Sequence, residues 1–572
     1  MTPHANGREA GGDVQLWHRV LALLAVISML IGTRTVWTDT VTIHPGLTVL
    51  VMAVYGAILA LGVLALTVPT LRAMVLVDLA ILVVAIAHVF ATYAVHPSPG
   101  DEGALTAQAA TSLLAGQHVY GVPWPQVFTQ PGVGLTKTMD GGGDLTYAYP
   151  PLAAILTAVG MRLLPSLPGN IVATAVTTGT LIAGGVALWL LLPVRWRSAG
   201  TAVMLAYPLL PGYARGGYPA VVAMVLLIPV VIDWPSTGVA GRLARAGVVR
   251  GILLGAACAA QQLAWFFVPF LLVGLFAVRR RELAPRAALL VVARFAAIAA
   301  MTFLAINAFF IVRDGPAAWL GGIVLPLTQH GVPHGQGLID LTYYLTNGSG
   351  ALDFYSYATL LFAAALVVLS LLFIRTLGPA LTVLPWLVFY LSIRSQDGYY
   401  LLMTPLWVAA AITVPRSWFA GAWQPTLPRL TSRPGRAALA AALVAPALAC
   451  LAVAVLTAAP LRMQILGADA HSAGNHGLWR LQVRVENVSS RPLAPHFAVS
   501  TNQSMSAYWR ADAGPAVLQP HETATYTLVA EPAGGYNPGT RGFFKLRAVT
   551  DKPQTLSTVA IPKSAPAVAS AP

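Results

Sequence analysis

Charged residues are scarce in this sequence: they make up 9% of it, against 57% hydrophobic residues. A typical soluble globular domain has about 25% charged residues, so a water-soluble enzyme is excluded. Cysteine is almost absent. Cys258 and Cys450 each lie within an apolar run, which excludes a disulfide framework and a cysteine metal site. The formal net charge of +14 is spread over short clusters between apolar runs, so we expect no nucleic-acid partner.

Long apolar runs dominate what is present. A helix that crosses a membrane needs roughly 20 apolar residues, and this criterion predicts a polytopic α-helical membrane protein with about thirteen transmembrane helices. They are predicted near residues 17–36, 46–66, 71–95, 170–193, 200–211, 219–233, 251–261, 262–278, 289–312, 352–373, 378–393, 399–414 and 437–456. Residues 17–459 would form this transmembrane domain, after a cytoplasmic segment at 1–16.

The sequence changes character after the last apolar run. Stretches of alternating hydrophobicity, such as WRLQVRVENV (479–488) and ETATYTLVAE (522–531), are separated by turn-forming residues. This period of two predicts a small β-sandwich at 460–560. Residues 561–572, rich in Ala, Ser and Pro, are expected to be a flexible tail.

The arginine residues indicate an orientation. Positively charged loops resist translocation, so they mark the cytoplasmic side. With a cytoplasmic N-terminus, that side collects most arginines outside the C-terminal region, among them Arg72, Arg195, Arg197, Arg242, Arg245 and Arg279–Arg281. We therefore expect a multi-pass protein of the plasma membrane with an extracytoplasmic C-terminal domain. The same asymmetry predicts that residues 149–164 form an amphipathic helix on the outer surface rather than a crossing.

Two outer loops are long, at residues 96–149 and 313–351, and long loops in a compact bundle often carry function. Carboxylates are enriched on this outer rim. Two interpretations are open. Solvation of the larger loops would alone give this enrichment of carboxylates, and the functional interpretation is an outward-facing polar site. The pair Asp101 and Glu102 directly follows the third predicted crossing and opens an expected helix that ends at Gly116. The helix dipole alone also favours carboxylates at a helix start.

The segments DEGALTAQAATSLLAGQHVYG (101–121) and YAYPPLAAIL (147–156) resemble the GT-C superfamily of integral-membrane glycosyltransferases. Within it, the resemblance is to the actinobacterial mannosyltransferase and arabinofuranosyltransferase group, similar to glycosyltransferase family 87. The shared pattern is an acidic residue after a crossing, a helix ending in Gly before an aromatic residue, and a Tyr-Pro-Pro segment. The resemblance covers roughly residues 71–416. Two additional helices precede it, and the acidic pair is adjacent rather than spaced, which leaves open which carboxylate is the base.

The resemblance implies transfer of a monosaccharide from a polyprenyl-phosphate donor to a cell-envelope glycan or glycolipid on the extracytoplasmic face. An apolar groove for the prenyl chain, open to membrane lipid, would adjoin a polar pocket for phosphate and sugar. Asp101 would then be the general base for the acceptor hydroxyl, with Glu102 as the substitute. The sequence identifies no cofactor with certainty; a divalent metal is compatible with it but is not indicated.

Outer-rim arginines are candidates for binding the phosphate of the donor. Arg394, in the segment IRSQDGYY, is the first choice because a guanidinium gives planar bidentate donors, and Arg215 is the second. Either one could instead snorkel to lipid headgroups. Asp397, Tyr399 and Tyr400 are candidates for contacting the sugar or acceptor, although aromatic residues also belong to interfacial belts.

Four further polar residues are candidates for substrate binding. His330 and His334 lie in a loop rich in Pro and Gly, which favours hydrogen bonding to sugar or phosphate over a metal site. Gln261 and Gln262 lie between two short crossings, where polar pairs line a cavity or pair across helices. The alternative function is a transporter or flippase of lipid-linked envelope precursors. Such a protein should show internal repeats and charges near the bilayer midplane, whereas the polar residues here gather at one rim.

Overall fold

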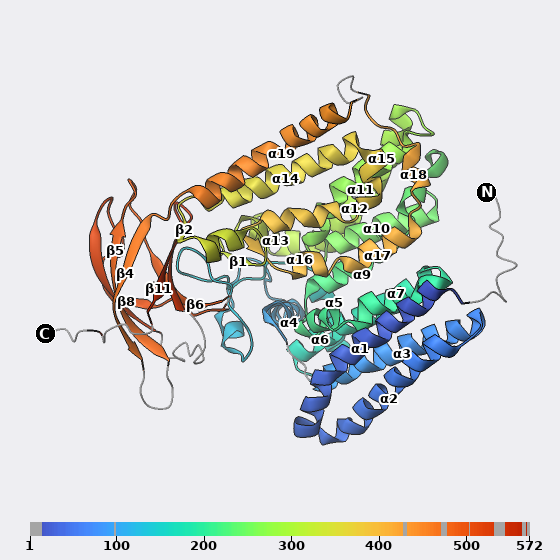
Figure 1. Cartoon of the computed structure of the whole chain (residues 1–572), viewed down its shortest axis with the longest axis horizontal. Helices are drawn as coiled ribbons and strands as arrows, with labels where there is room; N and C mark the ends of the chain where they lie inside the picture. The colour runs from blue at the N-terminus through green and yellow to red at the C-terminus, as the bar shows by residue number, and fades with distance from the viewer. Residues whose placement is uncertain are drawn as a thin grey trace.

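A computed structural model describes residues 14–95, 99–426, 432–470, 477–502, 504–530, 544–562 and 568. The expected cytoplasmic segment 1–16 and flexible tail 561–572 lie mostly outside these residues. Most of the described chain is helical, and a β-region follows at its C-terminal end. Figure 1 shows the β-region at one end of the helical bundle, with the short strands β1 and β2 on the side that faces the bundle.

Seven helices in the described residues are long and apolar enough to cross a membrane, or up to eight if a bent pair is one span. The seven are α1 (Leu16–Ile43), α2 (Pro45–Thr67), α3 (Leu71–Val95), α6 (Gly169–Leu191), α12 (Pro285–Arg313), α14 (Asp353–Leu372) and α19 (Arg433–Leu456). The bent pair, Ile374–Ala380 and Leu384–Leu391, turns by 78° at its break. A multi-pass membrane protein is compatible with this set of helices.

The remaining helices are shorter. They are α4 (Asp101–Leu114), α5 (Leu152–Leu163), α7 (Arg197–Thr201), α8 (Leu209–Gly216), α9 (Pro219–Val231), α10 (Arg245–Cys258), α11 (Leu263–Arg279), α13 (Pro316–Thr328), α15 (Ile374–Leu377), α16 (Gly398–Leu401), α17 (Thr404–Thr413) and α18 (Ser417–Ala420). The count of about thirteen crossings is not confirmed, because several predicted crossings fall on these helices. The 13 residues of α9 extend about 20 Å, less than a hydrocarbon core of about 30 Å. Apolar composition alone does not reveal where proline and glycine break a helix.

The first three helices pack together beside α7 (Figure 1). A buried polar contact joins them at one end. Asp78 of α3, which is fully buried, pairs with Nε2 of His18 at 2.8 Å and accepts a hydrogen bond from the Ser198 hydroxyl. These contacts link α1, α3 and α7, so Asp78 has a structural role.

The β-region contains two antiparallel sheets. The five-stranded sheet has the order β2-β11-β10-β6-β7, and the four-stranded sheet has the order β4-β5-β9-β8. The strands are β2 (Gly348–Ser349), β4 (Leu461–Ala470), β5 (Leu478–Asn487), β6 (His496–Thr501), β7 (Ser504–Met505), β8 (Arg510–Ala513), β9 (Thr523–Val529), β10 (Phe544–Thr550) and β11 (Thr555–Ile561). Leu481, Val483 and Val485 alternate along β5 into a core that also contains Phe497 and Leu546. The predicted β-structure after residue 460 is therefore present.

One strand of the five-stranded sheet comes from the helical region. β2 lies within the loop at 313–351 and pairs with β11, where Ser349 faces Leu556. The buried guanidinium of Arg547 on β10 donates to the carbonyl of Tyr343 at 3.0 Å. The loop at 313–351 and the β-region thus share a sheet, and the β-region lies on the same side of the bundle as this loop.

Candidate active site

A cavity of about 330 Å³ gathers residues from distant parts of the sequence. Six of the eleven predicted site residues line it: Asp101, Glu102, Gln261, Gln262, Arg394 and Tyr399. They come from the start of α4, the turn between α10 and α11, strand β3 (Arg394–Ser395) and helix α16. Two carboxylates, a guanidinium and two amides therefore face one enclosed space.

Close backbone packing positions the acidic pair. The Gly100 N–H donates to the carbonyl of Gly216 at 3.0 Å, and the backbone at Gly103 lies directly against the end of α8. Gly217 has φ +82°, a left-handed conformation that glycine adopts without strain. The helix α4 that follows matches the sequence expectation, and Gly116 beyond its end has φ +68°. The N-terminus of α4 thus presents both carboxylates to the cavity.

The two carboxylates have different electrostatic environments. Burial, and after it the charge of the neighbouring Asp101, raise the pKa of Glu102 to about 8, while a hydrogen bond from Tyr149 opposes the shift. Burial also raises the pKa of Asp101, but the Glu102 backbone and Arg394 counteract this shift. Glu102 therefore carries a proton at neutral pH. Asp101 is the carboxylate whose ionised form receives support from a hydrogen bond and a cation.

Asp144 is a third carboxylate at the cavity that the sequence did not single out. Its Oδ1 accepts from the N–H and the hydroxyl of Thr146, each at 3.0 Å, and its own N–H donates to Thr136 at 2.8 Å. Its charge contributes to the raised pKa of Asp101. Tyr149 and Tyr218 also line the cavity and were likewise not predicted as site residues.

The Tyr-Pro-Pro segment is held in place by hydrogen bonds from three directions. The hydroxyl of Tyr120 donates to the Tyr149 carbonyl at 2.7 Å, and the Leu152 N–H donates to Ala259 at 2.9 Å. The side-chain amide of Gln262 donates to the carbonyls of Ala148 and Ile323, each at 2.7 Å. Oε1 of Gln262 is buried and has no hydrogen-bond partner among the described residues, which makes it an acceptor available to a bound ligand.

Arg394 is positioned by a short parallel strand pair. β3 pairs with β1 (His334–Gly335), with Arg394 opposite His334. The Arg394 side chain lies across Gly331, where a Cβ would be 2.8 Å from its Cδ. Its Nε is buried without a hydrogen-bond partner in the part of the chain that the structure describes. A guanidinium with a free donor in a cavity is suited to an anionic group.

Part of the cavity wall is apolar. It consists of Leu263, Phe266, Pro326, Leu327, Leu360, Phe389 and Ile393. Leu327 on α13 is 48% exposed and Leu360 on α14 is 64% exposed. The apolar wall therefore includes exposed side chains of α13 and α14, along which a long apolar ligand could extend.

Five predicted residues do not line this cavity: Arg215, Asp397, Tyr400, His330 and His334. Asp397 accepts from the Tyr213 hydroxyl at 2.6 Å and from the Gly398 N–H at 2.8 Å, so it starts α16. The hydroxyl of Tyr400 donates to the Gln336 carbonyl at 2.8 Å. Asp397 contacts the cavity wall indirectly, because its partner Tyr213 packs edge-on against the lining residue Tyr218, with ring centroids 5.0 Å apart.

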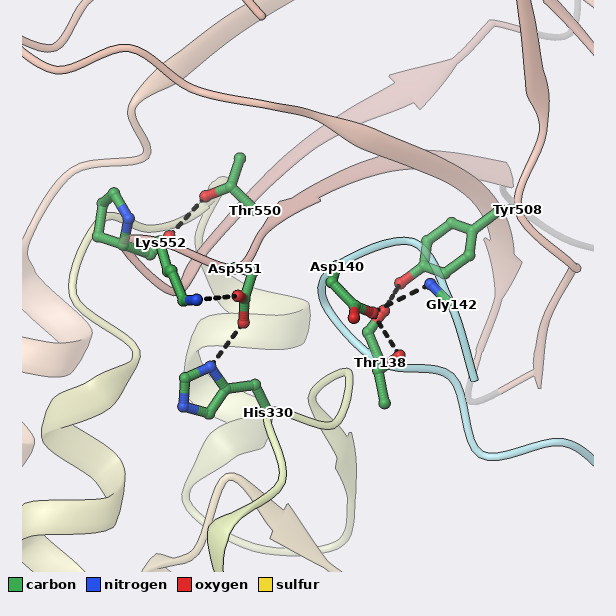
Figure 2. A network of polar contacts seen from close by, with 9 residues as sticks. Thr138, Asp140, Gly142, His330, Tyr508, Thr550, Asp551 and Lys552 are labelled. Carbon is green, nitrogen blue, oxygen red and sulfur yellow. Dashed lines mark hydrogen bonds and ion pairs between the residues drawn. The ribbon is translucent and has the colours of Figure 1, made fainter. Parts of the chain in front are cut away.

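The two histidines have different surroundings. Figure 2 shows the His330 ring turned toward Asp551 of the β10–β11 turn, with Nδ1 and Oδ1 2.6 Å apart. His334 lies in β1. Among the described residues, no three His, Cys, Asp or Glu side chains are grouped to hold a metal ion.

Comparison of the chain with protein-family models, curated proteins and solved structures finds no match. The geometry of the cavity therefore carries the functional argument.

Proposed function

We propose that this protein is a membrane glycosyltransferase that moves a monosaccharide from a polyprenyl-phosphate donor to a cell-envelope glycan or glycolipid. The observation that carries the proposal is the cavity itself. It joins Asp101, Glu102 and Arg394 to an apolar wall that reaches exposed Leu327 and Leu360. A lipid-linked sugar phosphate has the same two parts, a polar head and a long apolar chain.

In the proposed reaction Asp101 is the general base. It takes the proton from the acceptor hydroxyl as that oxygen attacks the anomeric carbon, and the bond from this carbon to the phosphate oxygen breaks. The departing electron pair goes to the phosphate, whose charge the Arg394 guanidinium stabilises. Glu102, protonated at neutral pH, donates a hydrogen bond in the same space. Oε1 of Gln262 accepts one from a sugar hydroxyl.

The proposed reaction takes place on the extracytoplasmic face of the plasma membrane, with the N-terminus in the cytoplasm. The distribution of arginine supports this orientation. Contacts between the β-region and the outer loops support a β-sandwich on the same side as the cavity: Tyr508 donates to the Thr138 carbonyl at 2.7 Å and Lys137 to Met505 at 3.4 Å.

The alternative is a transporter or flippase of lipid-linked precursors. Charged residues in membrane helices often mark a transport path. Here the buried Asp78 is occupied by His18 and Ser198, and the polar residues of the cavity collect at one end of the helices. Both observations favour chemistry at one face over passage through the membrane.

The test uses purified protein in lipid nanodiscs with a panel of labelled polyprenyl-phosphate monosaccharides that includes mannose and arabinofuranose. Wild type is compared with Asp101→Asn and Glu102→Gln, and Asp512→Asn in the exposed strand β8 is the matched control. We expect one donor to be consumed, Asp101→Asn to abolish transfer, and the control to match wild type. Transbilayer movement of the intact donor without any transfer would instead support the flippase.

A further inference from the structure

A second hollow, of about 540 Å³, adjoins the candidate active site. Asp144 and Gln329 line both spaces, so they form a shared wall. The other lining residues come from three segments. They are the loop at 96–149 (Pro123, Thr138, Asp140, Gly143, Leu145 and Thr146), the end of α13 (Leu325, Thr328 and the following His330) and the β10–β11 turn (Asp551 and Lys552). The hollow therefore extends from the reaction cavity to the β-region.

A third hollow, of about 440 Å³, continues in the same direction. It shares His330, Asp551 and Lys552 with the second hollow and ends at Arg491 in the β-region. The three spaces form a series from the acidic pair on α4 to the far side of the β10–β11 turn. Because neighbouring spaces share wall residues, an extended ligand could contact all three in turn.

Hydrogen bonds within the protein hold the walls of the second hollow (Figure 2). Oδ1 of Asp140 accepts from the Thr138 hydroxyl at 2.5 Å and from the Gly142 N–H at 3.1 Å. The Met139 N–H donates to the His330 carbonyl at 2.8 Å, and the His330 ring contacts Asp551. These hydrogen bonds connect the loop at 96–149, the segment after α13 and the β10–β11 turn to one another. A preformed site loses little conformational entropy on binding.

The chemistry of the walls indicates the class of ligand. Hydroxyl, amide and carboxylate groups share the lining of the second hollow with apolar groups such as Pro123, Leu145 and Leu325. Its carboxylates, Asp140, Asp144 and Asp551, outnumber its one lysine, Lys552. Carboxylates repel phosphate and other anionic headgroups. They accept hydrogen bonds readily from neutral hydroxyl groups. A neutral, polyhydroxylated chain fits this lining.

We propose that the second and third hollows bind the sugar units of an oligosaccharide acceptor that follow the unit attacked at Asp101. The inference rests on the proposed function, because the acceptor chain is placed with its reacting hydroxyl at Asp101. The β10–β11 turn is then a wall of the acceptor site. The end of α13 separates the acceptor chain from the apolar wall that receives the donor lipid.

The first experiment fills the second hollow. Thr328, the exposed last residue of α13, is replaced by Trp, and Thr67→Trp is the matched control. Thr67 is also an exposed final residue of its helix, and its hydroxyl donates to the carbonyl four residues earlier, as that of Thr328 does. Transfer is measured with a disaccharide and a hexasaccharide acceptor. We expect Thr328→Trp to raise KM for the hexasaccharide about tenfold more than for the disaccharide, the loss of roughly one good contact.

The second experiment probes the far end. Arg491→Ala changes the third hollow only, with Arg484→Ala on β5 as the control outside both hollows. We expect Arg491→Ala to weaken the hexasaccharide alone, because the disaccharide does not reach this hollow. The proposal would be overturned if Thr328→Trp and Arg491→Ala each changed KM equally for the disaccharide and the hexasaccharide.

A binding measurement separates this inference from the proposed function. Full-length Asp101→Asn protein is titrated calorimetrically with the hexasaccharide, with and without Thr328→Trp. If the hexasaccharide binds and Thr328→Trp abolishes this binding, the acceptor site is supported. If in addition no donor turns over, only the proposed function fails. Transfer by wild type with no dependence on Thr328 overturns the acceptor site and leaves the function standing. Preferential binding of an anionic lipid vesicle or a peptide at this hollow also overturns it.

Discussion

Gly103 lies directly against the carbonyl oxygen of Gly216, so that a Cβ at position 103 would overlap this oxygen. The contact brings the first turn of α4 against the end of α8. Asp101 and Glu102 lie in that first turn and line the cavity together with Arg394. A glycine outside the cavity thus determines the position of the acidic pair within it.

Gly103→Ala should therefore impair transfer without removing a polar group. The methyl group moves the start of α4 away from Gly216, and a displacement of about 1 Å of a catalytic group can reduce the rate about 100-fold. Initial rates of sugar transfer measure the effect. Gly179→Ala in α6 is the matched control, because a Cβ there meets no atom within 4 Å, and it should retain wild-type rates. Wild-type transfer by Gly103→Ala would show that the packing does not position the base.

The raised pKa of Glu102 predicts the pH dependence of transfer. With a pKa of about 8, Glu102 is protonated at neutral pH and loses its proton as the pH rises past about 8. The second negative charge beside Asp101 should then disfavour the donor phosphate, so the rate should fall on the alkaline side. Glu102→Gln keeps a neutral donor and should lose this alkaline decline. If the transfer rate of Glu102→Gln still falls at alkaline pH as that of wild type does, another group causes the decline.

The elements predicted well from the sequence are those with local signals. α4 has carboxylates at its start and a glycine after its end, and the structure contains this helix. The β-region follows from a period of two in residues such as those of β5. Hydropathy does not fix the number of crossings, because short apolar helices such as α9 have the same composition as parts of long ones.

The candidate site likewise contains residues that a local sequence pattern selects and residues that it does not. Asp101 and Glu102 are adjacent in the sequence, and Arg394 stands out as one of few outer arginines, so a linear pattern is enough to select them. Asp144 belongs to a loop whose path depends on nonlocal contacts, and no local pattern distinguishes it from the other outer carboxylates. His330 contacts Asp551, which is 221 residues away in the sequence, and no short-range pattern reveals such a pair.

Arg394→Lys tests whether the planar guanidinium is needed. Lysine keeps the charge but cannot give two parallel donors to phosphate, so the Kd for the donor should rise about tenfold. Equilibrium binding of a labelled polyprenyl-phosphate sugar to the Asp101→Asn background measures this without turnover. Arg462→Lys, an exposed arginine of β4 paired with Glu486, is the control and should leave the Kd unchanged. Full affinity in Arg394→Lys would mean that another residue binds the phosphate.

Asp78 should be needed for stability rather than for a proton path. Asp78→Ala leaves the buried His18 and Ser198 without their common acceptor, and unsatisfied buried polar groups cost about 1 to 3 kcal/mol each. Thermal unfolding of Asp78→Ala, His18→Ala and the double variant gives the coupling energy. We expect the double variant to be less destabilised than the sum of the single variants. Additive losses would show that the two residues do not interact.

The attachment of the β-region through β2 gives the last prediction. Gly348 has φ +116°, and a side chain there would overlap the Leu556 carbonyl oxygen of β11. Gly348→Val should therefore detach β2 from the sheet and expose the connection between α19 and β4 to limited proteolysis. Gly134→Val is the control, because a Cβ at position 134 would meet no atom within 4 Å. Proteolysis of this variant should match that of wild type. If the acceptor site includes the β10–β11 turn, Gly348→Val should also weaken long acceptors more than short ones. Unaltered digestion would mean that the remaining contacts, such as Arg547 with Tyr343, hold the β-region by themselves.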